Sequence, residues 1–276
     1  MFHYTAHDPP HQEIEVLSLA QLVRDGSWRL GLAHDRPDHL LIWITRGQGV
    51  GLIDGARRGL GLHNALFIPA RTLFSLDLNR QVFGHAVVIP ERAAPSLPAA
   101  LHHLRIRDAQ AQADLTALFE AICREQAAYR PLRQAAMAAH VELMSIWLQR
   151  QVESGADSLP RPTAAQRLSR AYCARLVSHY ASGASLTEHA TFLNVTSAHL
   201  TRVCKTEIGK TASALLSERL LHAARRLLSD TDMPAKDVAS HLGFGSAAYF
   251  TRFIQHHTQS SPIQLRRSAR SRVQSG

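Results

Sequence analysis

Hydrophobic and polar positions divide this chain into a strand-rich first part and a helix-rich second part. Residues 13–92 contain short apolar runs of strand length, which glycine, aspartate and asparagine separate. The runs occupy residues 28–32, 40–45, 49–53, 65–69, 73–76 and 86–89, and Asp54-Gly55 suits a hairpin turn after the third. Many short strands at regular spacing predict a β-sandwich or a β-barrel.

Two amphipathic helices are expected after a connector over residues 93–108. Each carries an apolar stripe whose residues recur at three-and-four spacing. The stripes consist of Leu115, Leu118, Phe119 and Ile122 in the first helix, and of Met137, Val141, Met144 and Leu148 in the second. Either both stripes pack on their own barrel or they form the interface of a homodimer, and the pattern leaves both alternatives open.

Residues 185–267 contain one pattern twice: a short amphipathic helix, a tight turn and a second helix. The turns contain Asn194 in the first copy and Gly243 in the second, and both residue types tolerate a left-handed backbone. Thr196 or Ser197 can cap the second helix of the first copy. The pattern therefore predicts two helix-turn-helix units, a motif that places its second helix in the major groove of DNA.

The second helix of each copy carries an arginine and a threonine beside the apolar residues that face inward. An arginine there can pair with guanine or hold a phosphate, and a threonine can contact thymine. The residues predicted to contact DNA are Ser197, Ala198, Thr201, Arg202 and Lys205 in the first copy, and Ala247, Ala248, Thr251 and Arg252 in the second.

These residues and their surroundings resemble the AraC/XylS family of transcription regulators. The matching residues are Gly209, Glu218-Arg219-Leu220, Leu227-Leu228, Thr231-Asp232, Val238-Ala239, Leu242-Gly243-Phe244, the run 248–253 and Ser261-Pro262. The resemblance implies two reading helices, joined by one long helix over residues 211–228, that enter successive major grooves. Gln259 departs from the family, which usually has glycine at this helix end, the residue best suited to a left-handed cap.

The strand-rich part also resembles the cupin-like sensor barrel found at the N-terminus of many members of that family. The likeness rests on the Gly47-x-Gly49 turn, the strand at residues 67–69 and the order of the strands. It implies that a small organic effector binds there. The side chains expected to hold the effector are Trp28, Arg29, His34, Trp43, His63 and His85.

The sequence is thus expected to form an α+β protein of two domains. A cupin-like effector-sensing β-barrel occupies residues 1–108, and a helical pair, the candidate dimerisation element, occupies residues 109–153. A linker over residues 154–164 leads to an all-α DNA-binding domain with two helix-turn-helix units over residues 165–276.

Charge supports the assignment of DNA binding to the second part. The net charge is +9. Residues 165–276 hold 15 Lys and Arg against 6 Asp and Glu, which gives +9, whereas residues 1–164 hold 16 of each kind. The whole excess of positive charge therefore lies in the half expected to bind the phosphate backbone.

Cupin barrels often bind a metal through closely spaced histidines and a glutamate, but this sequence has no such H-x-H and Glu pattern in its strand-rich part. We therefore expect no metal, no cofactor and no catalysed reaction. Cysteines are few and scattered, and Cys204 is expected to be a packed thiol. No apolar run is long enough to cross a membrane, and residues 1–10 lack the layout of a signal peptide, so a cytoplasmic location is expected.

The function predicted is that of a transcription regulator that responds to a small organic effector; activation is favoured, although the sequence leaves activation and repression both open. The overall layout looks most like family members that control aromatic-acid catabolism, such as 4-hydroxybenzoate regulators. The expected partners are promoter DNA, the effector, a second copy in a homodimer and RNA polymerase. Two alternatives are a cupin-type metalloenzyme with an accessory DNA domain and an effector-independent dimeric DNA-binding protein.

Overall fold

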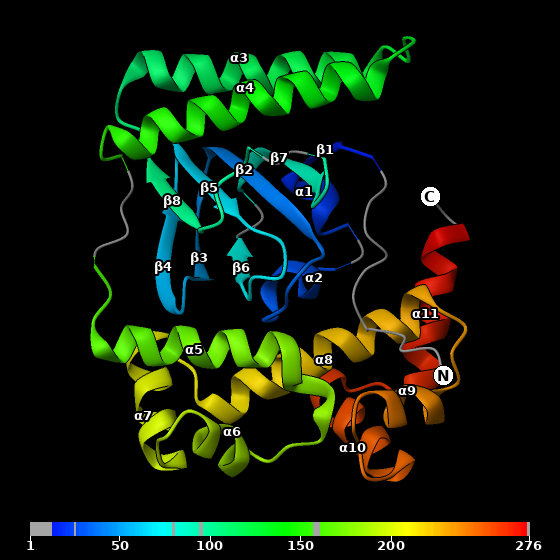
Figure 1. Ribbon diagram of the computed structural model, residues 1–276. Coiled ribbons are helices and arrows are strands. Elements are labelled where there is room, and N and C mark those ends of the chain that lie inside the picture. The colour runs from blue at the N-terminus through cyan, green and yellow to red at the C-terminus, as the bar shows by residue number, and fades with distance from the viewer. Residues whose placement is uncertain (1–12, 25, 79–80, 94–95, 157–160, 275–276) are drawn as a thin grey trace.

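The computed structural model describes residues 13–24, 26–78, 81–93, 96–156 and 161–274. The polar residues 1–10 and the middle of the expected linker, residues 157–160, lie outside that part. The elements form three layers, with a pair of helices above two β-sheets and a cluster of helices below them (Figure 1). The strand-rich first part and helix-rich second part are those that the sequence predicts.

The strands form two antiparallel sheets. The five-stranded sheet has the order β1 (Glu15–Ser18), β7 (Phe83–Pro90), β2 (Asp38–Arg46), β5 (Asn64–Ile68) and β8 (His102–Arg105). The three-stranded sheet has the order β4 (Ala56–Gly61), β3 (Gln48–Ile53) and β6 (Ser75–Leu78). The turn between β3 and β4 is the predicted Asp54-Gly55 hairpin, and both residues have positive φ, 54° and 69°.

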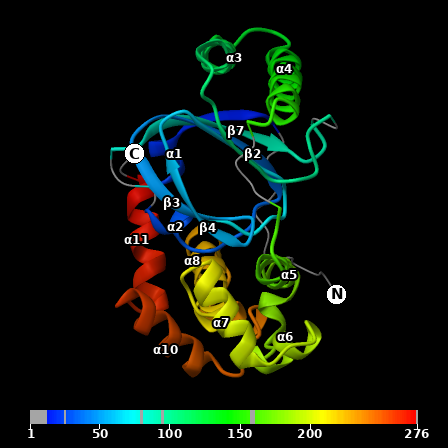
Figure 2. The ribbon, with the colours of Figure 1, turned by 90° about the vertical axis from the view of Figure 1, so that its left-hand side faces the viewer.

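The predicted closed barrel does not form among the described strands. The two sheets face each other across an aliphatic core and surround it in projection (Figure 2), but no ladder of hydrogen bonds joins them. Leu40, Ile42 and Leu66 of the larger sheet pack there with Ile53 and Leu76 of the smaller. Edge strands β4 and β8 therefore flank an open seam between the sheets.

Two sequence predictions of elements in this region were wrong. Residues 28–32 were predicted as a strand, but they form the short helix α2 (Trp28–Gly31) and its C-cap. This helix follows the equally short α1 (Leu19–Leu22). The expected connector over residues 93–108 contains β8, which pairs with β5. Both segments are too short for their apolar periodicity to distinguish a helix, a strand and a loop.

Helices α3 (Ala109–Ala127) and α4 (Arg133–Glu153) cover the outer face of the five-stranded sheet (Figure 1). Their predicted apolar stripes are largely buried, because Leu115, Phe119 and Ile122 of α3 and Met137, Val141, Met144 and Leu148 of α4 join one cluster with Leu41, Trp43 and Phe67 of the sheet. Of the two alternatives left open for these stripes, packing on their own sheet is therefore the one observed.

The remaining helices form the lower layer around one long helix, α8. They are α5 (Ala164–His179), α6 (Leu186–Phe192), α7 (Ser197–Glu207), α8 (Ala212–Asp230), α9 (Ala235–His241), α10 (Ala247–Thr258) and α11 (Pro262–Gln274). A 3-10 turn (Tyr180–Ser182) follows α5. At about 1.5 Å per residue, the 19 residues of α8 span roughly 28 Å.

The turns between α6 and α7 and between α9 and α10 follow the predicted chemistry. Asn194 has φ 55° and Gly243 has φ 74°, so both adopt the left-handed conformation. The Thr196 hydroxyl accepts the His199 N–H and caps α7. Gly243 also lies against Gly183, where an added Cβ would come within 2.5 Å of the backbone nitrogen, so that both conformation and space require glycine.

Gln259 ends α10 in the left-handed region, with φ 55°, where glycine is the favoured residue. We predict that Gln259→Gly raises the free energy of unfolding by roughly 0.5–1 kcal/mol, because relief of the left-handed strain exceeds the greater backbone entropy of unfolded glycine. Urea denaturation measures the change. The matched control is Gln255→Gly, an exposed position inside α10, where glycine should cost about 1 kcal/mol. A loss of stability in both variants would contradict the expected backbone strain at Gln259.

Candidate nucleic-acid interface and effector site

The exposed face of α7 gathers the residues predicted to contact DNA in the first copy. Ser197, Ala198, Thr201, Arg202 and Lys205 line one shallow hollow on the surface, together with Thr206 and Thr211. The opposite face of the helix is fixed in the core through Leu200, Val203 and Cys204. One face of α7 therefore holds the helix in place while the other presents hydroxyl and cationic groups to a ligand.

The predicted residues of α10 are also accessible. Ala247, Ala248 and Arg252 are exposed, and Thr251 is half-buried with its hydroxyl donating to the Ala247 carbonyl at 2.9 Å. Phe250, on the opposite face, is fully buried. Arg252 forms no hydrogen bond or ion pair within the part of the chain that the structure describes, so its guanidinium is available to a phosphate or a base.

Tyr249 is a surface residue that the sequence interpretation missed. Its side chain is 55% exposed and stands between Ala248 and the buried Phe250 at the start of α10. The signal was present, because Tyr249 directly precedes the inward-facing Phe250 of an amphipathic helix. One side of its ring packs near Phe244, with centroids 5.8 Å apart, and the rest is accessible. A tyrosine at this end of a helix can donate its hydroxyl to phosphate or pack on a sugar.

Helices α7 and α10 lie on the side of α8 remote from the sheets, and two perpendicular views agree on this arrangement (Figures 1 and 2). The sheets therefore do not cover the predicted DNA contacts. His199, one turn earlier in α7, positions the Arg202 side chain, because Arg202 Nη2 lies 2.9 Å from His199 Nδ1.

The six residues predicted to hold an effector do not line one cavity. The structure places Trp43, His63 and His85 on the outer face of the larger sheet toward α3, and Trp28, Arg29 and His34 toward α8. They were expected to line the mouth of the barrel together, and the interior between the sheets is filled largely by leucine and isoleucine side chains. The alternation of short strands did not reveal which face each residue takes.

The first group forms the wall of an open groove under α3. Trp43 is buried and stacks on His63 with ring centroids 5.8 Å apart, and its Nε1 donates to Thr116 Oγ1 at 3.2 Å. His85 lies against Phe119 of α3, with centroids 6.4 Å apart. A pocket of about 590 Å³ lies here, between Trp43, His63 and α3.

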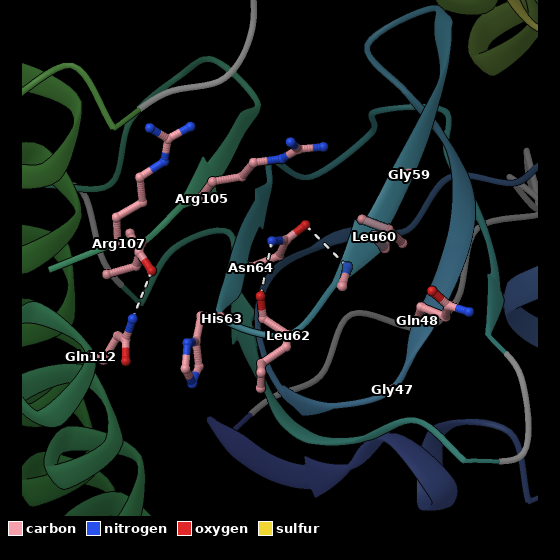
Figure 3. Close-up of a pocket in the computed structure, with 12 residues that line it drawn as sticks. Gly47, Gln48, Gly59, Leu60, Leu62, His63, Asn64, Arg105, Arg107 and Gln112 are labelled. Atoms are coloured by element: carbon pink, nitrogen blue, oxygen red, sulfur yellow. Dashed lines mark hydrogen bonds between the residues drawn. The ribbon is translucent and has the colours of Figure 1, made fainter. Parts of the chain in front are cut away.

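A second pocket, of about 720 Å³, opens on the other side of His63 between the edge strands β4 and β8 (Figure 3). Asn64 supports its floor, because the Asn64 Oδ1 accepts the Gly61 N–H at 3.2 Å and lies 2.9 Å from His103 Nε2. Arg105 and Arg107 line the opening. The sequence interpretation assigned no role to either arginine.

The second group contributes to a buried contact between the sheets and α8. His34 stacks on His222 of α8 with ring centroids 4.2 Å apart, and Trp28 lies 5.4 Å from the same ring. Arg29 forms an ion pair with Asp230 at 3.1 Å. These residues join the strand-rich part of the protein to α8.

An ion pair between Asp35 and Arg219 of α8 lies at the centre of this contact. Arg219 Nη2 and Asp35 Oδ1 are 2.6 Å apart, and the side chains are only 2% and 0% exposed. The Arg219 guanidinium also stacks 3.7 Å from the Tyr180 ring centroid. Beside it, the Glu218 carboxylate accepts the Ala33 N–H at 3.1 Å and forms an ion pair with Lys210 at 2.7 Å. The sequence interpretation matched Glu218-Arg219 to the family but did not find their partner.

Burial also shifts the pKa of both histidines in this contact and of a cysteine in the core under α7. It lowers the pKa of His34 from 6.5 to about 3, and lowers that of His222 as well. It raises the pKa of the Cys204 thiol to about 12, so that this cysteine stays protonated and packs in the core as predicted.

No group of three or more His, Cys, Asp or Glu side chains among the described residues is arranged to hold a metal. None of the helices that the structure describes combines the length and apolar character needed to cross a bilayer.

The buried histidine pair predicts a pH dependence. Because His34 and His222 take up protons in the unfolded state below about pH 6.5 but resist protonation when folded, stability is present above that pH and lost as the pH falls. Between pH 7 and pH 5 we expect the wild type to lose up to about 2 kcal/mol more than His222→Gln. Urea denaturation across this range measures both, with His256→Gln as the exposed control. Parallel curves for wild type and His222→Gln would contradict the prediction.

Comparison with protein families locates a known domain in the lower layer. Residues 189–268 match the family described as a helix-turn-helix domain. This segment runs from α6 to α11 and includes α7, α8 and α10. It also contains most of the residues on which the resemblance to AraC/XylS regulators rests.

Two relatives match about a quarter of the chain. An uncharacterized HTH-type transcriptional regulator, YfiF of Bacillus subtilis (strain 168), is 32% identical over 77 residues, which are 28% of this chain and 24% of that protein. The probable transcription factor PqrA of Proteus vulgaris is 35% identical over 68 residues, which are 25% of this chain and 56% of that protein. The chain thus spans about a quarter and about half the length of these two relatives.

Two solved structures are similar to this chain at low TM-scores. ToxT of Vibrio cholerae strain SCE256, in complex with an unsaturated fatty acid, is 12% identical with a TM-score of 0.46, over 93% of this chain and 96% of that chain. The C-terminal domain of AraT, a response regulator of Geobacillus stearothermophilus, is 29% identical with a TM-score of 0.36, over 40% of this chain and 88% of that chain. The sequence match to the family and the paired helices inside it identify residues 189–268 as a helix-turn-helix domain.

Proposed function

We propose that this protein is a transcription regulator of the AraC/XylS type, which binds promoter DNA through α7 and α10. The observation that carries the proposal is the accessible face of α7, with Arg202 and Lys205 beside small side chains, inside a segment that matches a helix-turn-helix domain. The excess of nine positive charges over residues 165–276 supplies the electrostatic attraction to phosphate.

Both helix pairs take part in the proposed complex. The α9–α10 pair repeats the helix, left-handed turn and helix of α6–α7, and α8 connects the two. Successive major grooves on one face of DNA are about 34 Å apart, a distance comparable to the length of α8. In this proposal α7 and α10 enter successive grooves, with α8 as a rigid spacer and RNA polymerase as a further partner at an activated promoter.

Regulation in this proposal comes from a small organic effector that binds the strand-rich part. The resemblance to regulators of aromatic-acid catabolism makes an aromatic acid, such as 4-hydroxybenzoate, the first compound to test. The two pockets beside His63 offer volumes of about 590 and 720 Å³, within the range of small-molecule sites. No chemical reaction is part of the proposal.

In this proposal the protein acts as a homodimer. The interface is the outward face of α4, which the sequence interpretation did not consider. The predicted stripe of Met137 to Leu148 is buried on the sheet, whereas Leu143 and Ile146 on the outward face are 50% and 44% exposed. With the exposed Ala139 they recur at four and three residues along α4, as in a coiled-coil seam. A second copy would present two more reading helices to the same promoter.

We predict that Arg202→Ala weakens binding to the native promoter by roughly 1–3 kcal/mol, because an arginine in the major groove pairs with a base or a phosphate. The loss should exceed that of Arg252→Ala if the first helix pair dominates base contacts. Gel-shift titrations at fixed salt compare the two, with Arg167→Ala on α5 as the control. Equal or reversed losses would overturn the ordering, and unchanged binding in both variants would overturn the proposed interface.

Negative charges introduced on the outward face of α4 test the proposed dimer. The double variant Leu143→Glu and Ile146→Glu should convert a dimer to a monomer, because two buried carboxylates per subunit would face each other without partners. Light scattering after size-exclusion chromatography gives the mass directly. Ala127→Glu, exposed elsewhere on α3, is the control. A wild type that is monomeric, or a double variant that remains dimeric, would refute this interface.

A further inference from the structure

The seam between edge strands β4 and β8 leads from the surface toward the space between the two sheets. Each strand pairs on one side only, β4 with β3 and β8 with β5. The corner that joins β4 to β5 is held open by His63 in the left-handed conformation, φ 58°, and by the Asn64 amide that accepts the Gly61 N–H. The pocket of about 720 Å³ occupies this seam.

Arg105 points into the seam. It lies opposite Asn64 in the register of β5 and β8, and therefore on the same face of the sheet. That face is the inward one, because Leu66 on the same side packs between the sheets whereas the alternate residues Ala65 and Leu104 pack toward α3 and α4. Figure 3 shows the Arg105 side chain extending from β8 toward Gly59 of β4.

A second inward cation lies on β4. Arg58 is on the same face as Leu60, which lines the pocket and belongs to the core between the sheets. Arg58 is half-buried, and its Nε is covered without a hydrogen-bond partner in the part of the chain that the structure describes. A covered guanidinium N–H without an acceptor is costly unless a ligand accepts it.

The pocket lacks a counter-charge of its own. Among the described residues, its lining contains Arg105, Arg107 and His63 but no aspartate or glutamate. Within that same part, neither Arg105 nor Arg107 donates a side-chain hydrogen bond or forms an ion pair. The rest of the lining combines apolar surface, such as Leu60, Leu62 and Ile106, with glycines. Positive charge beside apolar surface fits an anion with a hydrocarbon body.

We propose that the seam binds a small organic monocarboxylate, with Arg105 as its anchor. Arg105 can hold both carboxylate oxygens in a bidentate pair, Arg58 lies further along the same face of β4, and Arg107 stands at the rim. The hydrocarbon part of the ligand lies against Leu60 and Leu62. That this ligand is the effector rests on the function proposed above, whereas the site itself rests only on these residues.

Arg105 also touches the connection to the lower layer. Its backbone N–H donates to the Ala156 carbonyl at 3.2 Å, at the point where the chain leaves α4 toward α5. Ser169 and Arg170 of α5 in turn bond the backbone of Gly55 and Asp54, at the far end of β4. A ligand that draws β4 and β8 together therefore acts on two points at which α5 is attached.

The test is a thermal-shift titration of the full-length protein with benzoate, 4-hydroxybenzoate, phenylacetate and octanoate, each beside its uncharged primary amide and beside inorganic phosphate. We expect at least one carboxylate to raise the melting temperature with a saturable dose response, and its amide and phosphate not to do so. Calorimetric titration of that carboxylate should give a Kd weakened at least about tenfold in Arg105→Gln. Arg130→Gln, beyond the far end of α3, should bind as the wild type does.

Several outcomes would overturn the site: no carboxylate shifts the wild type, the amide or phosphate binds equally well, or Arg105→Gln and Arg130→Gln bind alike. Arg58→Gln gives a second variant should Arg105→Gln fail to fold, with the same loss expected. Gel shifts of the unliganded variants separate this site from the proposed function. Loss of carboxylate binding with DNA binding retained supports the site, whereas carboxylate binding in a protein that never binds promoter DNA would leave the site standing and refute the regulator.

Discussion

The buried ion pair between Asp35 and Arg219 is the interaction on which the arrangement of this protein depends. It joins a loop of the strand-rich part to the middle of α8, the helix that connects the two helix pairs. Removing one partner of such a pair costs about 3–5 kcal/mol because it leaves the other charge buried, whereas the intact pair adds little over an apolar contact. Its effect is therefore on geometry, because only one docking of the sheets on α8 satisfies both charges.

The groups around the pair support that one docking. Glu218 accepts a backbone N–H from the loop on one side, and His34 stacks on His222 on the other. Tyr180 covers the guanidinium with its ring. These contacts all lie on the face of α8 that turns toward the sheets, so they leave α7 and α10 accessible on the opposite side. The strand-rich part thus fixes the helix that spaces the proposed reading helices without covering them.

Local chemistry could be predicted from the sequence, whereas the assignment of faces and distant partners could not. Asn194, Gly243 and Thr196 took the predicted turn and cap positions because each depends on its own backbone conformation. His34 was expected in a pocket and instead lies in the contact with α8, since its partner is almost two hundred residues away in the chain. A short strand such as β8 gives too few alternations to show that Arg105 points inward, and the apolar stripes of α3 and α4 could not reveal whether a sheet or a second copy would cover them.

The two attachments of the lower layer to the sheets differ in a way that bears on regulation. The contact around Arg219 is buried and neutralised by Asp35, and the charges at its edges are paired as Glu218 with Lys210 and Arg29 with Asp230, so a small ligand would have to displace existing ion pairs. The contact through α5 combines hydrogen bonds to the backbone of Asp54 and Gly55, an ion pair between Arg170 and Asp54, and apolar packing of Leu52 against α5. It lies near the seam, where Arg105 and Arg107 form no ion pair within the part of the chain that the structure describes. A binding event can shift an equilibrium only where the two states differ in interaction with the ligand. In the proposed regulation, an anion bound by Arg105 in the seam supplies that difference, while the Arg219 contact holds α8 on the sheets.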